Sequence, residues 1–296
     1  MVKFFLSTDS TADLFADEIS SMGLGFLPLT LTLERNGGYE FMDDKFTEYS
    51  QYTDFYDMLR AAVPAKTSMN NLEKHKEYFT SLAKKGVTDC LHFTISYGLA
   101  PTMDVANQAA AEVKAEYPKF NVKVVESHTT TVGQGMLVKG AYKLQQGGAS
   151  LQEAYDWAEY SKHRIQHFII VSDLQHLKRG GRVSGAAAAI GTMMNLKIYL
   201  TFDKNGKLAV LKKIMGGTKK AIKTIIDEGK PFTLAKEHYL TAAHSDNEKE
   251  VNELIAALKE QFGVEAEKRI VGPTIGCHLG PGAIAYVFIS NEERAV

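Results

Sequence analysis

The sequence predicts an α/β protein with two lobes: an N-terminal lobe with a mostly parallel sheet and flanking helices, and a second, mixed α/β lobe. Short apolar runs alternate with amphipathic stretches of helical period along the chain, as in βα units. The 296 residues exceed the length at which one hydrophobic core usually keeps growing. A glycine-rich break at 147–150 places the boundary between residues 1–150 and 151–296.

The expected strands are short apolar runs bounded by polar or turn-forming residues. They lie at residues 2–7, 90–96, 122–126, 168–172, 197–202, 232–238 and 283–289. The sequence Asp203-Lys204-Asn205-Gly206 is a hairpin-turn signal, and it predicts that residues 207–211 pair with 197–202.

The expected helices are amphipathic stretches, several of which begin with capping residues. They lie at residues 55–62, 72–85, 103–117, 135–145, 151–165, 187–194, 218–228 and 248–262. In each of four cases a Ser or Asn is followed three residues later by an acidic residue, as in a capping box. These pairs are Ser10 with Asp13, Asn70 with Glu73, Ser150 with Glu153, and Ser245 with Glu248.

The composition is that of an ordinary globular protein, with 45% hydrophobic and 23% charged residues. The net charge of −1 gives no electrostatic reason to expect a nucleic acid or an anionic membrane as partner. Two cysteines, Cys90 and Cys277, are expected to be free thiols in a reducing cytosol. The N-terminal apolar run is too short for a signal peptide, and the apolar stretch at 185–194 is about half a membrane span. We therefore expect a cytoplasmic protein without stable membrane insertion.

Ser and Thr residues are concentrated where the apolar runs stop. Such clusters lie at residues 7–11, 94–98 and 127–133, and a fourth at Thr67 and Ser68 follows Pro64 in an expected loop. Ligands of open α/β sheets bind beyond the carboxyl ends of the strands. Hydroxyl groups there, with the amides of the following helices, suit a carboxylate or phosphate. Each cluster could equally cap the next helix, but four together favour an anionic ligand; Ser10, Ser96 and Ser127 are candidate contacts.

Other binding chemistries have weak signals. No phosphate-binding loop is present, and Gly133-Gln134-Gly135 lacks the third glycine of a dinucleotide motif. The nine histidines form no convincing metal set, so we expect neither cofactor nor metal. His278 lies among glycines at 276–282, and such a loop would let the backbone approach a ligand closely. His278 is therefore a candidate ligand contact, although a structural role is equally open.

Arg179 and Arg182 flank a glycine pair within residues 177–184. One interpretation is the start of a helix with solvated charges. The other is a basic rim for an anionic group or for an acidic partner.

These segments together resemble the DegV family of fatty-acid-binding proteins. They occur in the family's order and span nearly the whole chain. The matching pieces are Thr8-Asp9-Ser10-Thr11-Ala12-Asp13-Leu14, Thr67-Ser68, Ile95-Ser96, Ser127 with Thr131, Gly133 and Gly135, residues 177–184, Asn195-Leu196-Lys197 and residues 276–282. The chain departs from the family pattern at 95–102, where two further serines are missing, and at 213–218, where an arginine is missing.

The resemblance implies a non-catalytic carrier that encloses a long-chain fatty acid between and within its lobes. Some members present the carboxylate to a separate fatty-acid kinase, which makes an acyl phosphate for phospholipid synthesis. It also implies that Thr67, Ser68 and Ser96 hold the carboxylate and that His278 lies nearby.

The resemblance places Arg179 and Arg182 close to the mouth of the site, where they would dock a partner. An apolar tunnel fits this function, because each buried methylene group contributes roughly 0.8 kcal/mol.

The alternative function is that of a serine-dependent hydrolase or acyltransferase, with Ser96 as nucleophile and His278 as base. That chemistry needs a third, orienting carboxylate. The sequence contains no Gly-x-Ser-x-Gly nucleophile elbow around Ser96. A nucleic-acid-binding or regulatory role has only the basic stretch at 212–223 in its favour.

Overall fold

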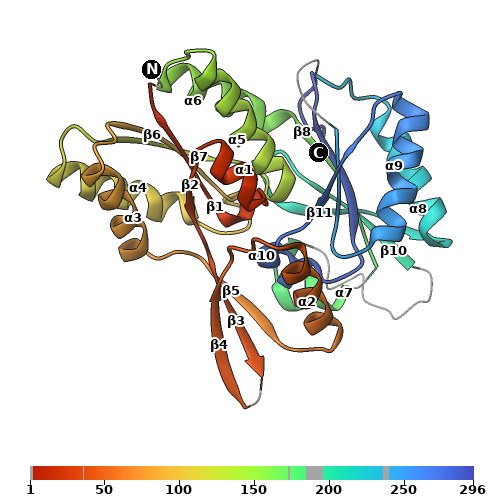
Figure 1. Cartoon of the computed structure of the whole chain (residues 1–296). Coiled ribbons are helices and arrows are strands. Elements are labelled where there is room, and N and C mark those ends of the chain that lie inside the picture. Colours follow the sequence, from red (N-terminus) through yellow and green to blue (C-terminus); the bar gives the residue numbers. More distant parts are fainter. Residues whose placement is uncertain (1–2, 36, 173, 185–195, 236–239) are drawn as a thin grey trace.

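The computed structural model contains two α/β lobes that lie side by side, with a narrow arm of strands projecting from the base of the molecule (Figure 1). The structure describes residues 3–35, 37–172, 174–184, 196–235 and 240–296. The helix predicted at 187–194 lies outside these ranges. The predicted fold class is confirmed, because one sheet is parallel and a second is mixed.

The first sheet is parallel and is covered by helices on both faces. Its strands, in spatial order, are β2 (Gly25–Leu27), β1 (Phe5–Asp9), β6 (Asp89–Thr94) and β7 (Asn121–Glu126). The helices are α3 (Leu72–Lys84) and α4 (Thr102–Glu116) on one face, and α5 (Thr131–Gln146) and α6 (Leu151–Ser161) on the other. Cys90 of β6 packs with α3 and α4, whereas Leu91 and Phe93 pack with α5. This two-sided burial explains the continuous apolar run of β6.

The second sheet has seven strands and mixed pairing. In spatial order they are β13 (Glu267–Ile270), β12 (Thr241–His244), β14 (Ile284–Ile289), β8 (Ile165–Val171), β10 (Leu196–Phe202), β11 (Leu208–Met215) and β9 (Val183–Ser184). Helices α8 (Gly217–Gly229) and α9 (Glu248–Phe262) cover its outer face. Alternate side chains of β8 divide between the faces, since Phe168 and Ile170 pack beneath these helices while Ile169 faces the first lobe. The largest core therefore lies between the lobes.

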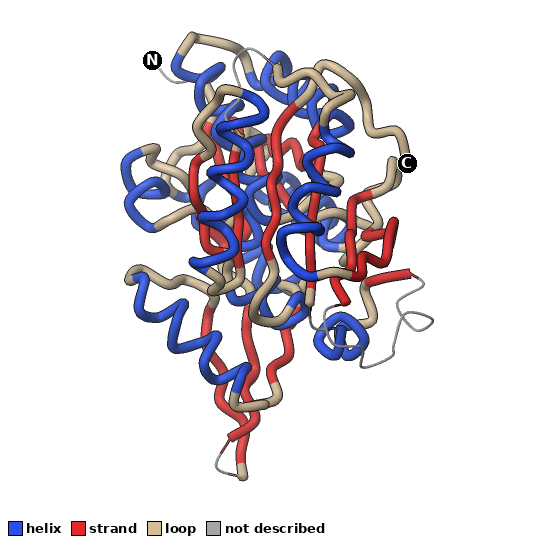
Figure 2. Tube along the Cα trace, turned by 90° about the vertical axis from the view of Figure 1, so that its right-hand side faces the viewer, coloured by secondary structure: helices blue, strands red, loops and turns tan. Residues whose placement is uncertain are grey.

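The arm is a three-stranded antiparallel sheet that the sequence did not predict. It consists of β4 (Gly38–Asp43), β3 (Thr30–Arg35) and β5 (Ala65–Ser68), in that order. The arm forms the lower end of the molecule in Figure 2. Helix α2 (Tyr49–Arg60) packs on one face through Phe55 and Tyr56, against Leu31 and Leu33 of β3.

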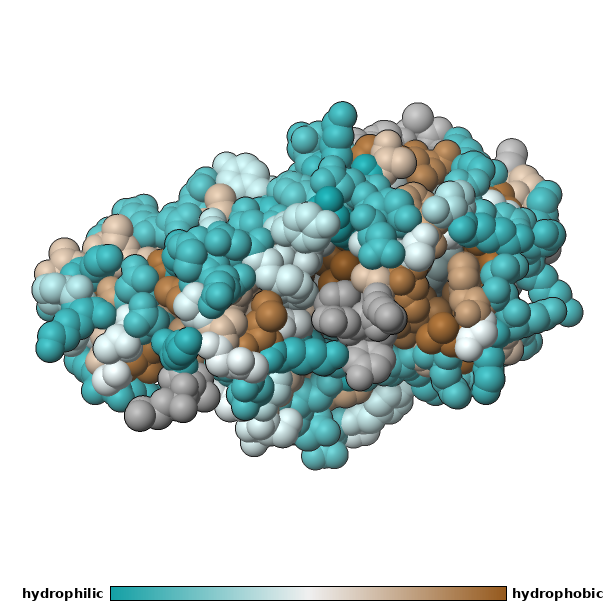
Figure 3. All heavy atoms as spheres, turned by 90° about the horizontal axis from the view of Figure 1, so that it is seen from above, coloured by the Kyte–Doolittle hydropathy of each residue, from teal (hydrophilic) through white to brown (hydrophobic). Residues whose placement is uncertain are grey.

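The remaining short elements connect these layers. They are η1 (Ser10–Ala12), α1 (Ala16–Ser21), η2 (Lys162–Arg164), α7 (Leu174–Gly180) and α10 (Pro273–Leu279). Helix α10 lies between the arm and the second lobe (Figure 1) and packs against α2, α7, β3 and β5. Seen from above, the surface is largely hydrophilic, with apolar groups showing near the middle and over the second lobe (Figure 3).

Several predicted element boundaries are corrected by the structure. Of the strand expected at 232–238, the structure describes residues 232–235, and these contain a single bridge from Leu234 to Ser290 instead of a strand; residues 236–238 lie outside the described ranges. The apolar side chains of Phe232 and Leu234 pack onto the outer core of the second sheet without joining a strand ladder. The helix expected at 151–165 ends at Ser161, because η2 and β8 follow immediately.

The hairpin prediction is confirmed, since Phe202 pairs with Leu208 across the turn. The capping box at Ser150 is confirmed as well. The other three predicted N-caps are displaced: η1, α3 and α9 are capped by Asp9, Asn71 and Asn247, respectively. Within the described residues, none of the helices has both the length and the apolar character needed to cross a bilayer.

The boundary at residue 150 stays a prediction. Helix α6, which begins directly after it, packs against α5, β6 and β7 of the first lobe.

Candidate functional site

A cavity of about 190 Å³, here called the interlobe cavity, opens between the second sheet, α10, the start of α5 and the arm. Most of its lining is apolar, including Ile169, Ala243, Ala285 and Val287 from the inner face of the second sheet. Polar groups are few, and three of them, Thr67, His278 and Arg182, were singled out in the sequence. A largely apolar cavity with a few polar groups is typical of a small-molecule site.

The arm delivers Thr67 to this cavity. Adjacent residues of a strand point to opposite faces, and Thr67 shares its face with its register partner Leu31, which is fully buried. Its hydroxyl oxygen lies 2.8 Å from Nε2 of His278. Ser68 instead points to the other face and is exposed. The two residues were expected together in a loop; they lie on a strand, and only Thr67 lines the cavity.

His278 lies in the last turn of α10, where a glycine-rich loop was expected. Pro273 at the start and Gly280 at the end delimit this helix. Gly276 makes room for α2, because an added Cβ would lie 2.8 Å from the Tyr56 hydroxyl. The glycines of this segment therefore permit helix packing.

Burial, together with the positive charge of Arg182, lowers the pKa of His278 to about 4. The imidazole is therefore neutral at physiological pH. Its Nε2 faces Thr67, while Nδ1 has no hydrogen-bond partner within the described part of the protein.

The depressed pKa of His278 predicts an acid-sensitive contribution to stability. The unfolded state, with a pKa of 6.5 for this group, binds the proton more tightly than the folded state. The contribution should therefore be fully present above about pH 6.5 and be lost as the pH falls towards 4. Urea titrations of the wild type and His278→Gln between pH 4 and 7.5 would show it, because the unfolding free energy of the wild type should fall more steeply on acidification than that of the variant. A parallel pair of pH curves would contradict the prediction.

The two arginines are separated by the structure. Arg182 lines the interlobe cavity, and its Nη1 donates to the Gly180 carbonyl at 2.6 Å. Arg179 is not part of the lining; its Nη2 lies 3.2 Å from the ring nitrogens of His176.

Ser96 is fully buried and is engaged with the β10–β11 hairpin tip (residues 203–206). Its hydroxyl donates to the Gly206 carbonyl at 2.7 Å and accepts from the Gly98 amide at 3.2 Å. Its neighbours Ile95 and Leu99 line the interlobe cavity, but Ser96 does not.

The hairpin tip is held from its outer side by Arg294. This side chain is 8% exposed and donates hydrogen bonds to the carbonyls of His128 at 2.9 Å, Asp203 at 3.0 Å and Lys162. Burial lowers the pKa of the guanidinium to about 10, so it remains charged. Arg294 thus connects the first lobe, the tip and η2.

Ser10 and Ser127 also make internal contacts. The Ser10 hydroxyl accepts from the Leu29 amide at 3.1 Å, and the Ser127 hydroxyl donates to the Thr129 carbonyl at 2.9 Å. Neither lines the interlobe cavity. The hydroxyl clusters at 7–11 and 127–133 are joined through Gln134.

The centre of this polar network is the buried carboxylate of Asp9, which was not among the site residues predicted from the sequence. It accepts from Gln134 Nε2 at 2.9 Å, Thr11 N at 3.0 Å and Ile95 N at 3.2 Å. The network holds the ends of three neighbouring strands together. An acid directly after an apolar run was the available signal.

His167 is a second polar residue that the sequence analysis did not place at the site. It lines the interlobe cavity, and burial holds its pKa well below its usual range. Its Nε2 lies 2.6 Å from the Thr129 hydroxyl oxygen. From the sequence alone, a single histidine within an apolar strand cannot be assigned to the lining of a cavity rather than to the packed core.

The geometry offers little support for serine nucleophilic catalysis. Within the described ranges, the Ser96 hydroxyl contacts Gly206 and Gly98 rather than a histidine, and His278 contacts Thr67. Among the same residues, no group of three His, Cys, Asp or Glu side chains could hold a metal ion.

Comparison with known proteins gives a consistent match over the whole chain. The family model described as "Uncharacterised protein, DegV family" matches residues 3–291. A DegV domain-containing protein of Clostridium perfringens is 31% identical over 296 residues, which is 99% of this chain and 100% of the relative.

Two solved structures are similar in both sequence and fold. A DegV family protein from Thermus thermophilus, described as fatty acid binding, is 28% identical with a TM-score of 0.83, and the match covers 97% of this chain and 99% of that one. A fatty acid binding DegV family protein from Streptococcus agalactiae is 26% identical with a TM-score of 0.81, covering 99% of this chain and 100% of that one.

Proposed function

The chain belongs to the DegV family, and we propose that it binds a long-chain fatty acid whose carboxylate end lies in the interlobe cavity, at Thr67, His278 and Arg182. The observation that carries this proposal is the placement of these three polar groups in a largely apolar cavity. The fatty acid binding of the Thermus thermophilus and Streptococcus agalactiae proteins supports it.

The energetics of such a site are favourable. Each buried methylene group contributes roughly 0.8 kcal/mol, which is roughly 10 kcal/mol in total for a sixteen-carbon chain. Association and ordering costs reduce this sum, and micromolar or tighter binding remains. At the head group, the Thr67–His278 pair can donate one hydrogen bond while it keeps its own, either from the Thr67 hydroxyl or from Nδ1–H of the neutral His278 ring, and Arg182 supplies a positive charge.

Ser96 could join this head-group site only by giving up its bond to Gly206, because its single hydroxyl proton is already donated there. Ser10 and Ser127 face the strand-end network, and Ser68 faces away from the cavity. The proposed head-group site is therefore smaller than the hydroxyl clusters of the sequence suggested.

The proposed role is that of a carrier without catalysis of its own. A partner fatty-acid kinase would phosphorylate the presented carboxylate, and the basic rim at Arg179 would dock an acidic face of that partner. Charges at such a rim mainly affect the rate and salt dependence of association.

Lipid extraction of the purified protein tests the proposal most directly. We expect mass spectrometry to detect a co-purified long-chain fatty acid, and the delipidated protein to bind hexadecanoate at micromolar or lower concentration. Failure of the delipidated, folded protein to bind any fatty acid would overturn the proposal. Ester hydrolysis that depends on Ser96 would favour the alternative enzyme.

The separation of the two arginines predicts different losses when each is replaced. Arg182→Gln should weaken hexadecanoate binding by about tenfold, since it removes a charge-assisted contact of about 1.5 kcal/mol. Arg179→Glu should keep lipid affinity and lose acyl phosphate formation when a fatty-acid kinase and ATP are added. Equal lipid loss in both variants would place Arg179 at the head group, and unimpaired phosphorylation in Arg179→Glu would remove it from the docking face.

A further inference from the structure

A second cavity of about 330 Å³, here called the α1–α5 cavity, lies between α1, α5 and the β12–β13 edge of the second sheet. Its interior is apolar and includes Leu14, Met22, Val132 and Met136. Its rim is charged, and four of the rim groups, Glu18, Lys139, Glu267 and Arg269, are paired with one another. Arg269 binds the carboxylates of Glu18 and Glu267, and Lys139 Nζ lies 2.8 Å from Glu18. The rim therefore leaves the apolar interior as the part available to a ligand.

The interlobe cavity alone is too small for a long-chain fatty acid. An apolar cavity of about 150 Å³ holds one benzene molecule, which corresponds to about 25 Å³ per carbon atom. On that scale the 190 Å³ of the interlobe cavity holds about eight carbons, and the 330 Å³ of the α1–α5 cavity holds about thirteen. A chain of sixteen to eighteen carbons needs both.

The two cavities are neighbours along the same face of the second sheet. On β12, Thr241 lines the α1–α5 cavity and Ala243 lines the interlobe cavity. Likewise, Arg269 of β13 lines the α1–α5 cavity, and Val271, just beyond the end of β13, lines the interlobe cavity. Residues two apart on a strand share a face and are separated by about 6.6 Å. On each of these two adjacent strands, the residues that line the two cavities are therefore only two positions apart.

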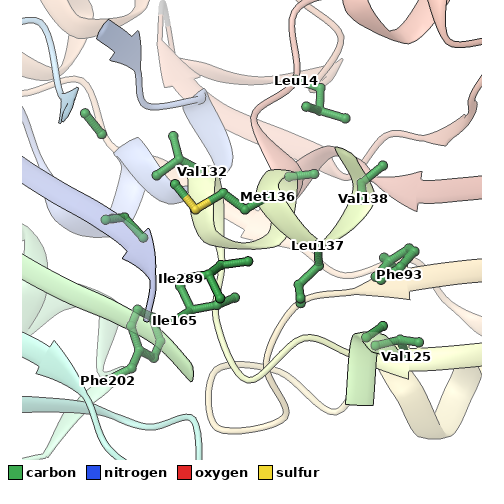
Figure 4. Close-up of a cluster of buried hydrophobic side chains, with 14 of the residues drawn as sticks. Leu14, Phe93, Val125, Val132, Met136, Leu137, Val138, Ile165, Phe202 and Ile289 are labelled. Carbon is green, nitrogen blue, oxygen red and sulfur yellow. The ribbon is translucent and has the colours of Figure 1, made fainter. Parts of the chain in front are cut away.

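The partition between them is formed by the first turns of α5. Thr131 lines the interlobe cavity, whereas the next residue, Val132, and Met136 one turn later line the α1–α5 cavity. Both side chains point from α5 towards the second lobe (Figure 4) and belong to the same core cluster as Ala243 and Val271. Methionine is unbranched and adapts its shape to its surroundings, so Met136 can move without disturbing the helix.

We propose that the α1–α5 cavity receives the distal half of the acyl chain, and that Met136 is the movable partition that sets the longest chain accepted. This inference rests on the proposed fatty acid binding. It assigns the ligand class as long-chain acids with an apolar end, because most of the described lining is apolar and the carboxylates of Glu18 and Glu267 are paired with Arg269. The exception is Asp13, whose buried carboxyl oxygens have no hydrogen-bond partner within the described residues; burial raises its pKa well above its usual range.

A chain-length series tests the assignment. Saturated acids from eight to eighteen carbons are titrated into the delipidated wild type and into Met136→Trp, whose indole would fill the passage. In the wild type, affinity should rise by up to fourfold per added methylene beyond eight carbons. In Met136→Trp the rise should stop near eight to ten carbons, so that hexadecanoate binds at least a hundredfold more weakly than to the wild type while octanoate affinity is unchanged.

Two further variants keep the result interpretable. Leu137→Met changes the next buried residue of α5, which lines neither cavity, and it should reproduce the wild-type series. Met136→Ala widens the passage and should retain or strengthen binding of eighteen-carbon acids, which covers the case that the tryptophan variant does not fold. Hexadecanoate affinity within threefold of wild type in folded Met136→Trp would overturn the inference, as would a wild-type series that levels off at eight carbons. Absence of binding by every acid would instead overturn the proposed function.

Discussion

Replacing Thr67 by valine is expected to weaken hexadecanoate binding by about tenfold to a hundredfold and to leave the fold intact. Valine has nearly the shape of threonine, so the packing of β5 against α10 is retained. The variant lacks the hydroxyl that lies 2.8 Å from His278 and faces the interlobe cavity. A hydrogen bond to a charged group contributes about 1.5–3 kcal/mol, which corresponds to this range of affinity. Titration of the delipidated variant measures the loss.

The neighbouring residue supplies the matched control. Ser68→Ala removes a hydroxyl from the same strand, but that hydroxyl is exposed on the opposite face. Its affinity should stay within about twofold of wild type, because a surface substitution of this kind usually changes free energies by no more than about 0.5 kcal/mol. Equal losses in both variants would show that the ligand reaches both faces of β5, and the proposed head-group site would then be wrong.

Replacing Arg294 by leucine is expected to lower the free energy of unfolding by about 3 kcal/mol or more. The guanidinium donates to three main-chain carbonyls from separate segments, those of His128, Lys162 and Asp203. Leucine fills part of the space but leaves these acceptors unpaired, and each buried unsatisfied group costs about 1–3 kcal/mol. Urea denaturation monitored by circular dichroism measures the effect.

Arg35→Leu is the control for the arginine substitution. Arg35 forms an ion pair with Glu40 at the arm, and both side chains are 44% exposed. A pair of this kind contributes about 0–1 kcal/mol, so the control should stay within that range. A loss below about 1 kcal/mol in Arg294→Leu would mean that water replaces the guanidinium at the hairpin tip without cost.

Much of the fold could be read from periodicity, because buried strands and amphipathic helices leave regular apolar patterns. The arm could not, since β4 is an edge strand whose largest side chains, Tyr39 and Phe41, are 64% and 71% exposed. The composition of β4 resembles that of a core strand, but its apolar side chains are exposed. The sequence alone therefore does not indicate an exposed edge strand here. The segment at 273–279 was misread for a related reason: its glycines indicated a loop, whereas they allow close helix packing.

The site was only partly predictable, because its geometry depends on partners distant in sequence. The strand-end position of Ser96 indicated a polar contact, but its acceptor, Gly206, is 110 residues away. Likewise, Thr67 and His278 could each be singled out, while their contact follows from the packing of the arm on α10. No local pattern marks the α1–α5 cavity, since its lining comes from five separate elements, η1, α1, α5, β12 and β13.

The strand order of the second sheet also governs when the site can exist during synthesis. β14 pairs with both β8 and β12. However, 112 residues separate the end of β8 at Val171 from the start of β14 at Ile284. At about 5–20 residues per second, the ribosome needs roughly 6–22 s to add this stretch. Throughout that interval the interlobe cavity lacks the wall formed by Ala285 and Val287. The first lobe can fold early on the nascent chain, but the proposed fatty acid could be enclosed only after translation of β14, so its loading would be a late step in the maturation of the protein.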